Sequence, residues 1–160
     1  MRMLRIVLML GLLLNAALSH SQSFTAGDVT IEHPWARATA KGSSTGVVYL
    51  TIINNGATSD KLISITSAVS QSAQVHENTV DAQGMTEMSP LDKVDIPAHA
   101  RVALKPTARH VMLLDLKNPL TYKSTFPLTL SFEKAGAIKV IVTVEKPGAM
   151  TFDKMDGMKM

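Results

Sequence analysis

The feature that most restricts the fold is a pair of alternating segments near the C-terminal end of the chain. Residues 127–133 (PLTLSFE) and 137–145 (AIKVIVTVE) alternate apolar and polar side chains. The apolar positions that share one parity are Leu128, Leu130 and Phe132 in the first segment and Val140, Val142 and Val144 in the second. Successive side chains of a strand point to opposite faces, so each segment predicts a β-strand with one buried face. Ala135-Gly136 between them has the composition of a turn.

Shorter apolar runs predict further strands at 47–53, 62–65, 102–104 and 111–116. Turn-forming sequences stand between the runs, namely 54–56 (NNG), 82–84 (AQG) and 97–99 (PAH). No segment beyond the first twenty residues has a helical period. Many short strands at this spacing predict an all-β fold, a Greek-key β-sandwich or barrel. A chain of 160 residues has room for one such domain, which we place at 24–146.

The first nineteen residues are typical of a secretory signal peptide. Arg2 and Arg5 precede an apolar run at 6–18 (IVLMLGLLLNAAL), and small residues lead to Ser19. This run is shorter than the helix of about 20 residues that crosses a membrane, and polar residues follow at once. We therefore expect residues 1–19 to be removed and the protein to act outside the cytoplasm. Because the chain has no cysteine to carry a lipid, we expect no membrane anchor on the mature protein.

Charge and cysteine content exclude several classes of function. Without Arg2 and Arg5, 14 of the 16 basic residues remain against 13 acidic ones, and no basic patch interleaved with aromatic residues supports nucleic-acid binding. The absence of cysteine excludes disulfides, thiolate metal sites, blue-copper centres and thiol nucleophiles. The chain also contains no nucleophile elbow, P-loop, dinucleotide fingerprint or HExxH motif. We therefore do not expect an enzyme.

Histidine and methionine are the remaining candidates for chemistry. His110 and Met112 share a parity, so on a strand both side chains leave one face while Val111 and Leu113 turn to the core. The segment 76–88, folded as a hairpin with its turn near 82–84, could supply further ligands. Thioethers and imidazoles together suit Cu(I). A lone histidine is more often structural and a methionine more often fills a core, yet the predicted strands 47–53, 128–132 and 140–144 contain no methionine.

The spacing of these residues resembles the signature of the PCuAC family of periplasmic copper chaperones, H(M)x10Mx21HxM. In this chain the signature reads His76-x11-Met88-x21-His110-x-Met112, with Glu77 at the position of the optional methionine. Other stretches that resemble the family are 34–38 (PWARA), 75–77 (VHE), 104–106 (LKP) and 127–133. The resemblance extends over residues 28–145. One departure is Tyr122-Lys123, where relatives often carry a turn glycine.

This resemblance implies a cupredoxin-like β-sandwich that binds one Cu(I) through His76, Met88, His110 and Met112. It further implies a periplasmic protein that delivers copper to the assembly of respiratory oxidase (cytochrome c oxidase), with an oxidase subunit or a Sco-type copper protein as its partner. Chaperone action requires at least one ligand that solvent can reach, and we expect a monomer. Two alternatives remain open: a copper-buffering or resistance protein with the same site, and an exported β-sandwich that binds a protein or glycan without metal.

Several other residues are weaker candidates. Met85 has the opposite parity to Met88 and could join the site only through a bend. His33 and His99 are expected to be structural, Trp35 a core anchor, and His20 a ligand only if cleavage makes it the N-terminus. Residues 147–160 predict a flexible Met-rich tail, either a plain chain end or a second copper-capturing segment. Its methionines are Met150, Met155, Met158 and Met160.

Overall fold

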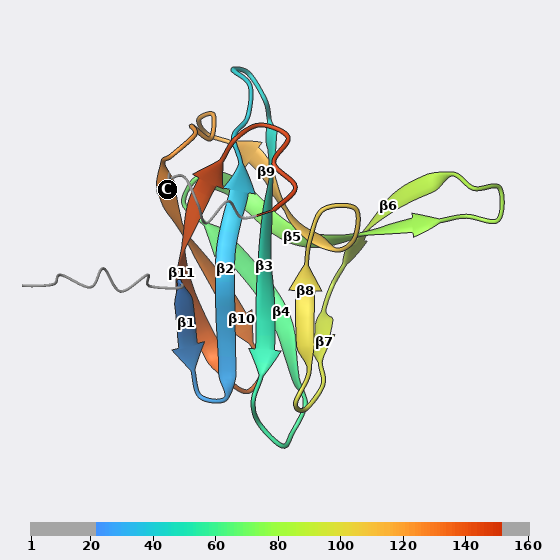
Figure 1. Cartoon of the computed structure of the whole chain (residues 1–160), viewed down its shortest axis with the longest axis vertical. Helices are drawn as coiled ribbons and strands as arrows, with labels where there is room; N and C mark the ends of the chain where they lie inside the picture. Colours follow the sequence, from blue (N-terminus) through green and yellow to red (C-terminus); the bar gives the residue numbers. More distant parts are fainter. Residues whose placement is uncertain (1–21, 152–160) are drawn as a thin grey trace, which may run out of the picture.

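A computed structural model describes residues 22–151, and every regular element in that range is a strand (Figure 1). The strands are β1 (Ser23–Ala26), β2 (Val29–Arg37), β3 (Thr45–Asn54), β4 (Asp60–Ser67), β5 (Ser70–Val80), β6 (Thr86–Leu91), β7 (Val94–Ile96), β8 (Arg101–Leu104), β9 (His110–Leu116), β10 (Thr125–Phe132) and β11 (Gly136–Glu145). Within residues 22–151 there is accordingly no helix of the length and apolarity that would cross a membrane. The expected all-β fold is confirmed.

Seven of these strands close into a flattened barrel in the order β2-β11-β10-β4-β5-β9-β3, with β3 pairing back to β2. The β2–β11 pairing is parallel, whereas the other pairings are antiparallel. Four short strands attach to the outside of this ring: β1 to β2, β8 to β3, β6 to β5 and β7 to β4. The segments that carry the candidate ligands, β5, β6 and β9, therefore lie side by side.

The core is built from the alternating positions that the sequence predicts. Leu128, Leu130 and Phe132 of β10 are buried against Val140 and its same-parity neighbours on β11, and the two strands form a hairpin in continuous register. Each predicted strand is present. The sequence did not single out β1, β2 or β7. In β2 the alternation is interrupted at His33-Pro34, where the register with β3 shifts and His33 adopts a φ of 50°. A bulge of this kind conceals the strand period.

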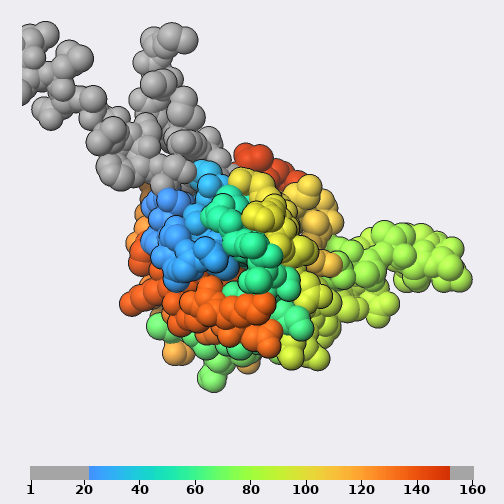
Figure 2. Space-filling model, turned by 90° about the horizontal axis from the view of Figure 1, so that it is seen from below, coloured from blue at the N-terminus to red at the C-terminus, as the bar shows by residue number. Residues whose placement is uncertain are grey.

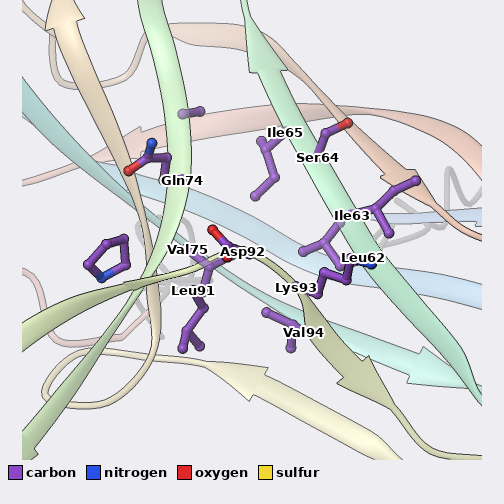
Figure 3. A pocket seen from close by; sticks show the side chains of 12 residues that line it. Leu62, Ile63, Ser64, Ile65, Gln74, Val75, Leu91, Asp92, Lys93 and Val94 are labelled. Carbon is purple, nitrogen blue, oxygen red and sulfur yellow. The ribbon is translucent and has the colours of Figure 1, made fainter.

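The barrel has a weak seam between β4 and β5, which form only the Ile65–Ala73 pair. After β5 the chain turns back as β6, which pairs with the second half of β5. It then bends at Asp92-Lys93 and continues as β7, which pairs with β4. A cavity of about 290 Å³ lies at this divergence (Figure 3). Leu62, Ile65 and Val75 contribute to its apolar part, and none of its lining residues is a histidine or methionine. The candidate ligands therefore do not line this cavity.

A hairpin formed by the end of β5, a turn and β6 projects from the barrel (Figures 1 and 2). We call residues 77–92 the arm. Its turn is closed by the Asp81 carboxylate, which accepts hydrogen bonds from the N–H groups of Gln83 (2.9 Å) and Met85 (2.8 Å). Gly84 follows with a φ of 80°, a conformation that suits glycine. The expected turn near 82–84 is confirmed.

Candidate metal centre

Strand register places the four candidate ligands on one face of the sheet. On β5 and β9, His76 lies opposite His110 and Gln74 lies opposite Met112. On β5 and β6, Asn78 lies opposite Met88. Residues directly opposite each other share a face, as do residues two apart on one strand. His76 is thus flanked directly by His110 and diagonally by Met112 on one side and Met88 on the other.

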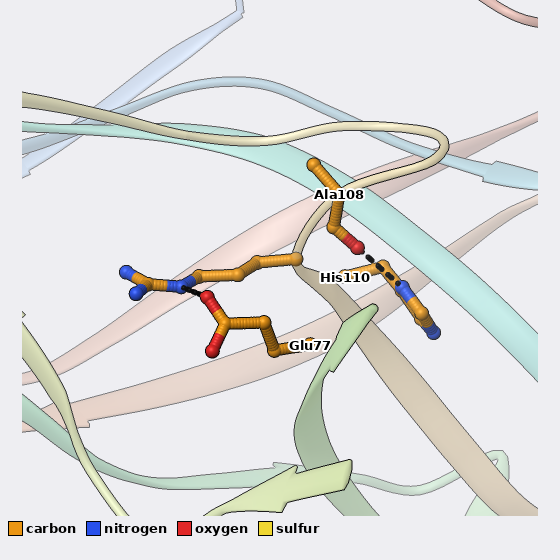
Figure 4. A network of polar contacts seen from close by, with 4 residues as sticks. Glu77, Ala108 and His110 are labelled. Atoms are coloured by element: carbon orange, nitrogen blue, oxygen red, sulfur yellow. Dashed lines mark hydrogen bonds and ion pairs between the residues drawn. The ribbon is translucent and has the colours of Figure 1, made fainter. Parts of the chain in front are cut away.

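The two histidine rings face each other across β5 and β9, with centroids 6.1 Å apart and planes inclined at 37°. The Nδ1 of His110 lies 3.1 Å from the carbonyl oxygen of Ala108 (Figure 4). A neutral imidazole that donates its Nδ1–H to this carbonyl keeps a lone pair on Nε2 for a metal. The carbonyl of Ala108 therefore fixes both the tautomer and the orientation of His110.

The imidazole of His76 has no such partner. Both of its ring nitrogens are buried and form no hydrogen bond with any residue in 22–151. Burial, and secondarily the proximity of His110, lowers the pKa of His76. The ring is therefore neutral at neutral pH, which is the form that ligates metals. A buried polar group without a partner is costly, and a metal ion would satisfy it.

The two methionines differ in their access to solvent. Met88 on the arm is 48% exposed, whereas Met112 on β9 is only partly exposed. His110 is 5% exposed, and Val111 and Leu113 lie in the core, as their parity predicted. The site is therefore more enclosed than an open rim of ligands, and solvent reaches it most freely at Met88.

A row of aromatic rings supports the enclosed side of this cluster. Tyr49 packs edge-on to His110, with ring centroids 6.5 Å apart. The ring centroids of Trp35 and Tyr49 are 4.6 Å apart. The guanidinium of Arg37 lies over the Tyr49 ring at 5.4 Å. Trp35 is buried, which confirms its expected place in the core. The row restrains the position of the His110 ring.

Glu77 follows His76 on β5 and therefore points to the opposite face of the strand. Its carboxylate accepts a hydrogen bond of 2.7 Å from the Nε of Arg109 (Figure 4). This ion pair joins β5 to the residue that precedes His110. Glu77 therefore links β5 to the start of β9 on the face opposite His76, and it does not enter the ligand cluster.

The other candidates lie outside the cluster. Met85 is 68% exposed in the turn of the arm. His99 occupies the predicted turn, with a φ of 56°, and His33 lies at the β2 bulge. Met150 places its sulfur 3.1 Å from Arg37. His20, Met155, Met158 and Met160, and with them most of the predicted tail, lie outside the described residues.

Three features were not expected from the sequence. Asn78 lies on the ligand face opposite Met88, and its Oδ1 is buried with no hydrogen bond to any residue in 22–151. Its parity with His76 was the available signal. Tyr49 contacts His110 through β3, a relationship that sequence spacing does not show. Lys123 adopts a φ of 69°, a backbone conformation that non-glycine residues rarely adopt.

Comparisons with known proteins agree with this architecture. The sequence model of the LpqE-like family (putative lipoprotein LpqE-like) matches residues 29–144. Protein RP573 of Rickettsia prowazekii is 35% identical over 107 residues, which cover 62% of this chain and 57% of that protein. Putative lipoprotein Lxx21020 of Leifsonia xyli subsp. xyli is 27% identical over 120 residues, 75% of this chain and 71% of that protein. The matched region thus spans just over half of the Rickettsia protein.

Solved structures extend the comparison to the fold. The apo PCuAC domain of PmoF2 superposes with a TM-score of 0.68 at 31% identity, covering 80% of this chain and 98% of that domain. The copper-bound form of that domain gives a TM-score of 0.68 at 31% identity, over 78% and 98%. The Cu(I) form of DR1885 from Deinococcus radiodurans shares the fold, with a TM-score of 0.59 at 24% identity over 78% and 81%. The expected cupredoxin-like fold is confirmed, and the chain belongs to the LpqE-like family.

Proposed function

We propose that this protein binds one Cu(I) ion through His76, Met88, His110 and Met112 and passes it to a partner by ligand exchange. The observation that carries the proposal is the opposed pair His76–His110, which two thioethers flank. The carbonyl of Ala108 orients the His110 ring, whereas both ring nitrogens of His76 form no hydrogen bond with any residue in 22–151. Imidazole and thioether together suit Cu(I). No three His, Asp or Glu side chains come together as a metal site within residues 22–151, so the donor set there favours a soft ion.

The copper-bound structure of the similar PmoF2 domain supports copper as the bound ion. Within the proposed site, the carbonyl of Ala108 and the ring of Tyr49 hold His110 in place. Met88 is the most accessible donor and lies on the projecting arm. A ligand from a partner can therefore replace the Met88 sulfur first, while the other three donors retain the ion.

The wider role follows from the resemblance of the sequence. We place the protein in the periplasm after removal of residues 1–19, and the lipoprotein names of its relatives support export. We further propose that the acceptor is an oxidase subunit or a Sco-type protein in the assembly of the copper centres of cytochrome c oxidase. Copper is then cargo, and no catalytic step is required of this chain.

The experiment is a Cu(I) competition assay with a colorimetric chelator under reducing conditions. It compares the full chain, a form ending at Thr151, the double variant His110→Ala/Met112→Ala and the matched control His99→Ala/Met85→Ala. The proposal expects one-to-one binding in the full chain, the shortened form and the control, and its loss in the first double variant. Binding that survives in His110→Ala/Met112→Ala, or that disappears with residues 152–160, would contradict it.

A further inference from the structure

The arm has two chemically different faces. The face shared with His76 presents Asn78, Val80, Thr86 and Met88, which carry no charge, because these residues oppose one another in the β5–β6 register. The opposite face presents Glu77 and Glu87. Six large hydrophobic side chains are exposed in residues 22–151, and three of them are Val80 (68%), Met85 (68%) and Met88 (48%) on the arm. The uncharged face thus places the exposed side chains of Val80 and Met88 beside the proposed metal site, with Met85 in the adjoining turn.

The charge of the arm is opposite to that of the rest of the molecule. Residues 77–92 contain four acidic residues, Glu77, Asp81, Glu87 and Asp92, and no basic one. The remainder of 22–151 contains 7 acidic and 12 basic residues. Glu77 is paired with Arg109, which leaves Asp81 and Glu87 close to Val80 and Met85 in the hairpin and Asp92 at the base of the arm. Exposed carboxylates of this kind steer an oppositely charged partner during encounter.

The same charge acts against pairing of the arm with itself. Within residues 22–151, β6 pairs only with β5, so its outer edge is open. An open edge beside an apolar face is prone to pair with a second copy. Two arms brought together would place like charges side by side, which opposes that contact. The arm therefore favours a partner that carries lysine or arginine around an apolar contact.

We infer that the arm is the docking surface for a copper-exchanging partner protein with a basic rim, and this inference rests on the proposed function. The apolar side chains Val80 and Met85 make the contact next to Met88. The carboxylates Asp81, Glu87 and Asp92 select the charge of the partner and hold it in position. Copper exchange then takes place at the one ligand that the arm carries.

The test uses two copper-free synthetic peptides with the same methionine-rich core, flanked by equal numbers of lysines or of glutamates. Each is titrated into the ¹⁵N-labelled full chain, and the amide shifts give both the affinity and the location of binding. At low ionic strength we expect the lysine peptide to bind at least about tenfold more tightly, with the largest shifts in 77–92 and an affinity that falls as salt is added.

Variants separate charge from apolar contact. Glu87→Gln/Asp92→Asn should weaken the lysine peptide at least about threefold, whereas the control Asp115→Asn/Glu133→Gln makes the same change of charge on the barrel and should not. Val80→Thr/Met85→Gln should weaken binding without changing its salt dependence. Equal affinities for the two peptides, shifts outside 77–92, or equal effects of the two charge variants would overturn the inference. Because the peptides carry no copper, the two failures can be told apart. A protein that does not bind Cu(I) contradicts the proposed function, whereas a protein that binds both peptides equally contradicts the docking surface.

Discussion

His76 and His110 lie directly opposite each other on β5 and β9, with ring centroids 6.1 Å apart. Continuous backbone pairing from Ala73–Leu113 to His76–His110 fixes their relative height. Three of the proposed ligands therefore sit on neighbouring barrel strands, where a one-residue slip would turn every side chain to the other face. Only Met88 is supplied by the projecting arm. The arrangement combines a rigid three-donor base with one accessible donor.

Two methionines of the arm give a matched pair of variants. Met88→Ala removes a sulfur from the ligand face and should weaken Cu(I) binding at least about tenfold, the scale on which metal sites respond to lost support. Met85→Ala removes the same side chain three residues away, in the turn, and should leave the affinity within about twofold. Chelator competition measures both. Equal losses in the two variants would contradict the assignment of Met88 as the ligand that the arm supplies.

Glu77→Met tests the register of the site. A methionine at this position projects to the face opposite His76, so it should not add a donor, and the Cu(I) affinity should remain within about threefold of the original. Loss of the Arg109 pair, whose side chains are 40% and 31% exposed, should cost at most about 1 kcal/mol of stability. Glu77→Gln is the control for that loss. A tightening of tenfold or more confined to the methionine variant would mean that the face assignment is wrong.

Tyr49→Leu removes the ring that packs against His110 while retaining a large apolar side chain on β3. Because the His110 imidazole would no longer be held by the Tyr49 ring, we expect the Cu(I) affinity to fall about tenfold, as it does when supporting groups are lost in other metal sites. The one-to-one stoichiometry should persist, because no ligand is removed. Titration monitored by the ¹⁵N signals of the His110 ring would follow both effects. Unchanged affinity would assign Tyr49 to the barrel core alone.

Asp60 predicts an acid-sensitive step in stability far from the metal site. Burial raises the pKa of this carboxyl, but the N–H groups of Lys134, Ala135 and Lys61 donate to it and bring the pKa below its ordinary value of 3.8. Because the folded pKa is the lower one, the carboxylate stabilises the fold at pH values above the ordinary pKa. This contribution is lost as the pH falls through the folded pKa.

Asp60→Asn should therefore lower the free energy of unfolding by about 1–3 kcal/mol at neutral pH, since one partly buried N–H loses its acceptor. Urea denaturation at a series of pH values would measure this. The difference between the two proteins should shrink in strong acid, because only the original chain loses a charge there. A difference that stays constant with pH would assign the effect to packing.

The barrel strands could be predicted because their periodicity is local. Leu128, Leu130 and Phe132 mark a buried face without knowledge of any partner strand, and His110 and Met112 mark an outer face in the same way. The bulge at His33 concealed β2, because one extra residue reverses the parity of the positions that follow. The position of β5 between β4 and β9 depends on long-range pairing that a local pattern does not encode.

The contrast between local pattern and long-range pairing also explains which features of the candidate site could be predicted. The spacing of His76, Met88, His110 and Met112 predicted the ligand set through a family resemblance, and the hairpin between the first two was anticipated from its turn. The contact of Tyr49 with His110 and the ion pair of Glu77 with Arg109 join residues that are distant in sequence. They follow from strand order and register, which were not available from the chain alone.

The most direct test of the central claim is X-ray absorption at the copper edge of the Cu(I)-loaded protein, measured on the form that ends at Thr151. We predict a mixed shell of imidazole nitrogen and thioether sulfur in equal numbers, with sulfur reduced in Met88→Ala and unchanged in Met85→Ala. A shell of sulfur alone, or of nitrogen and oxygen without sulfur, would contradict the assignment of His76, Met88, His110 and Met112 as the copper ligands.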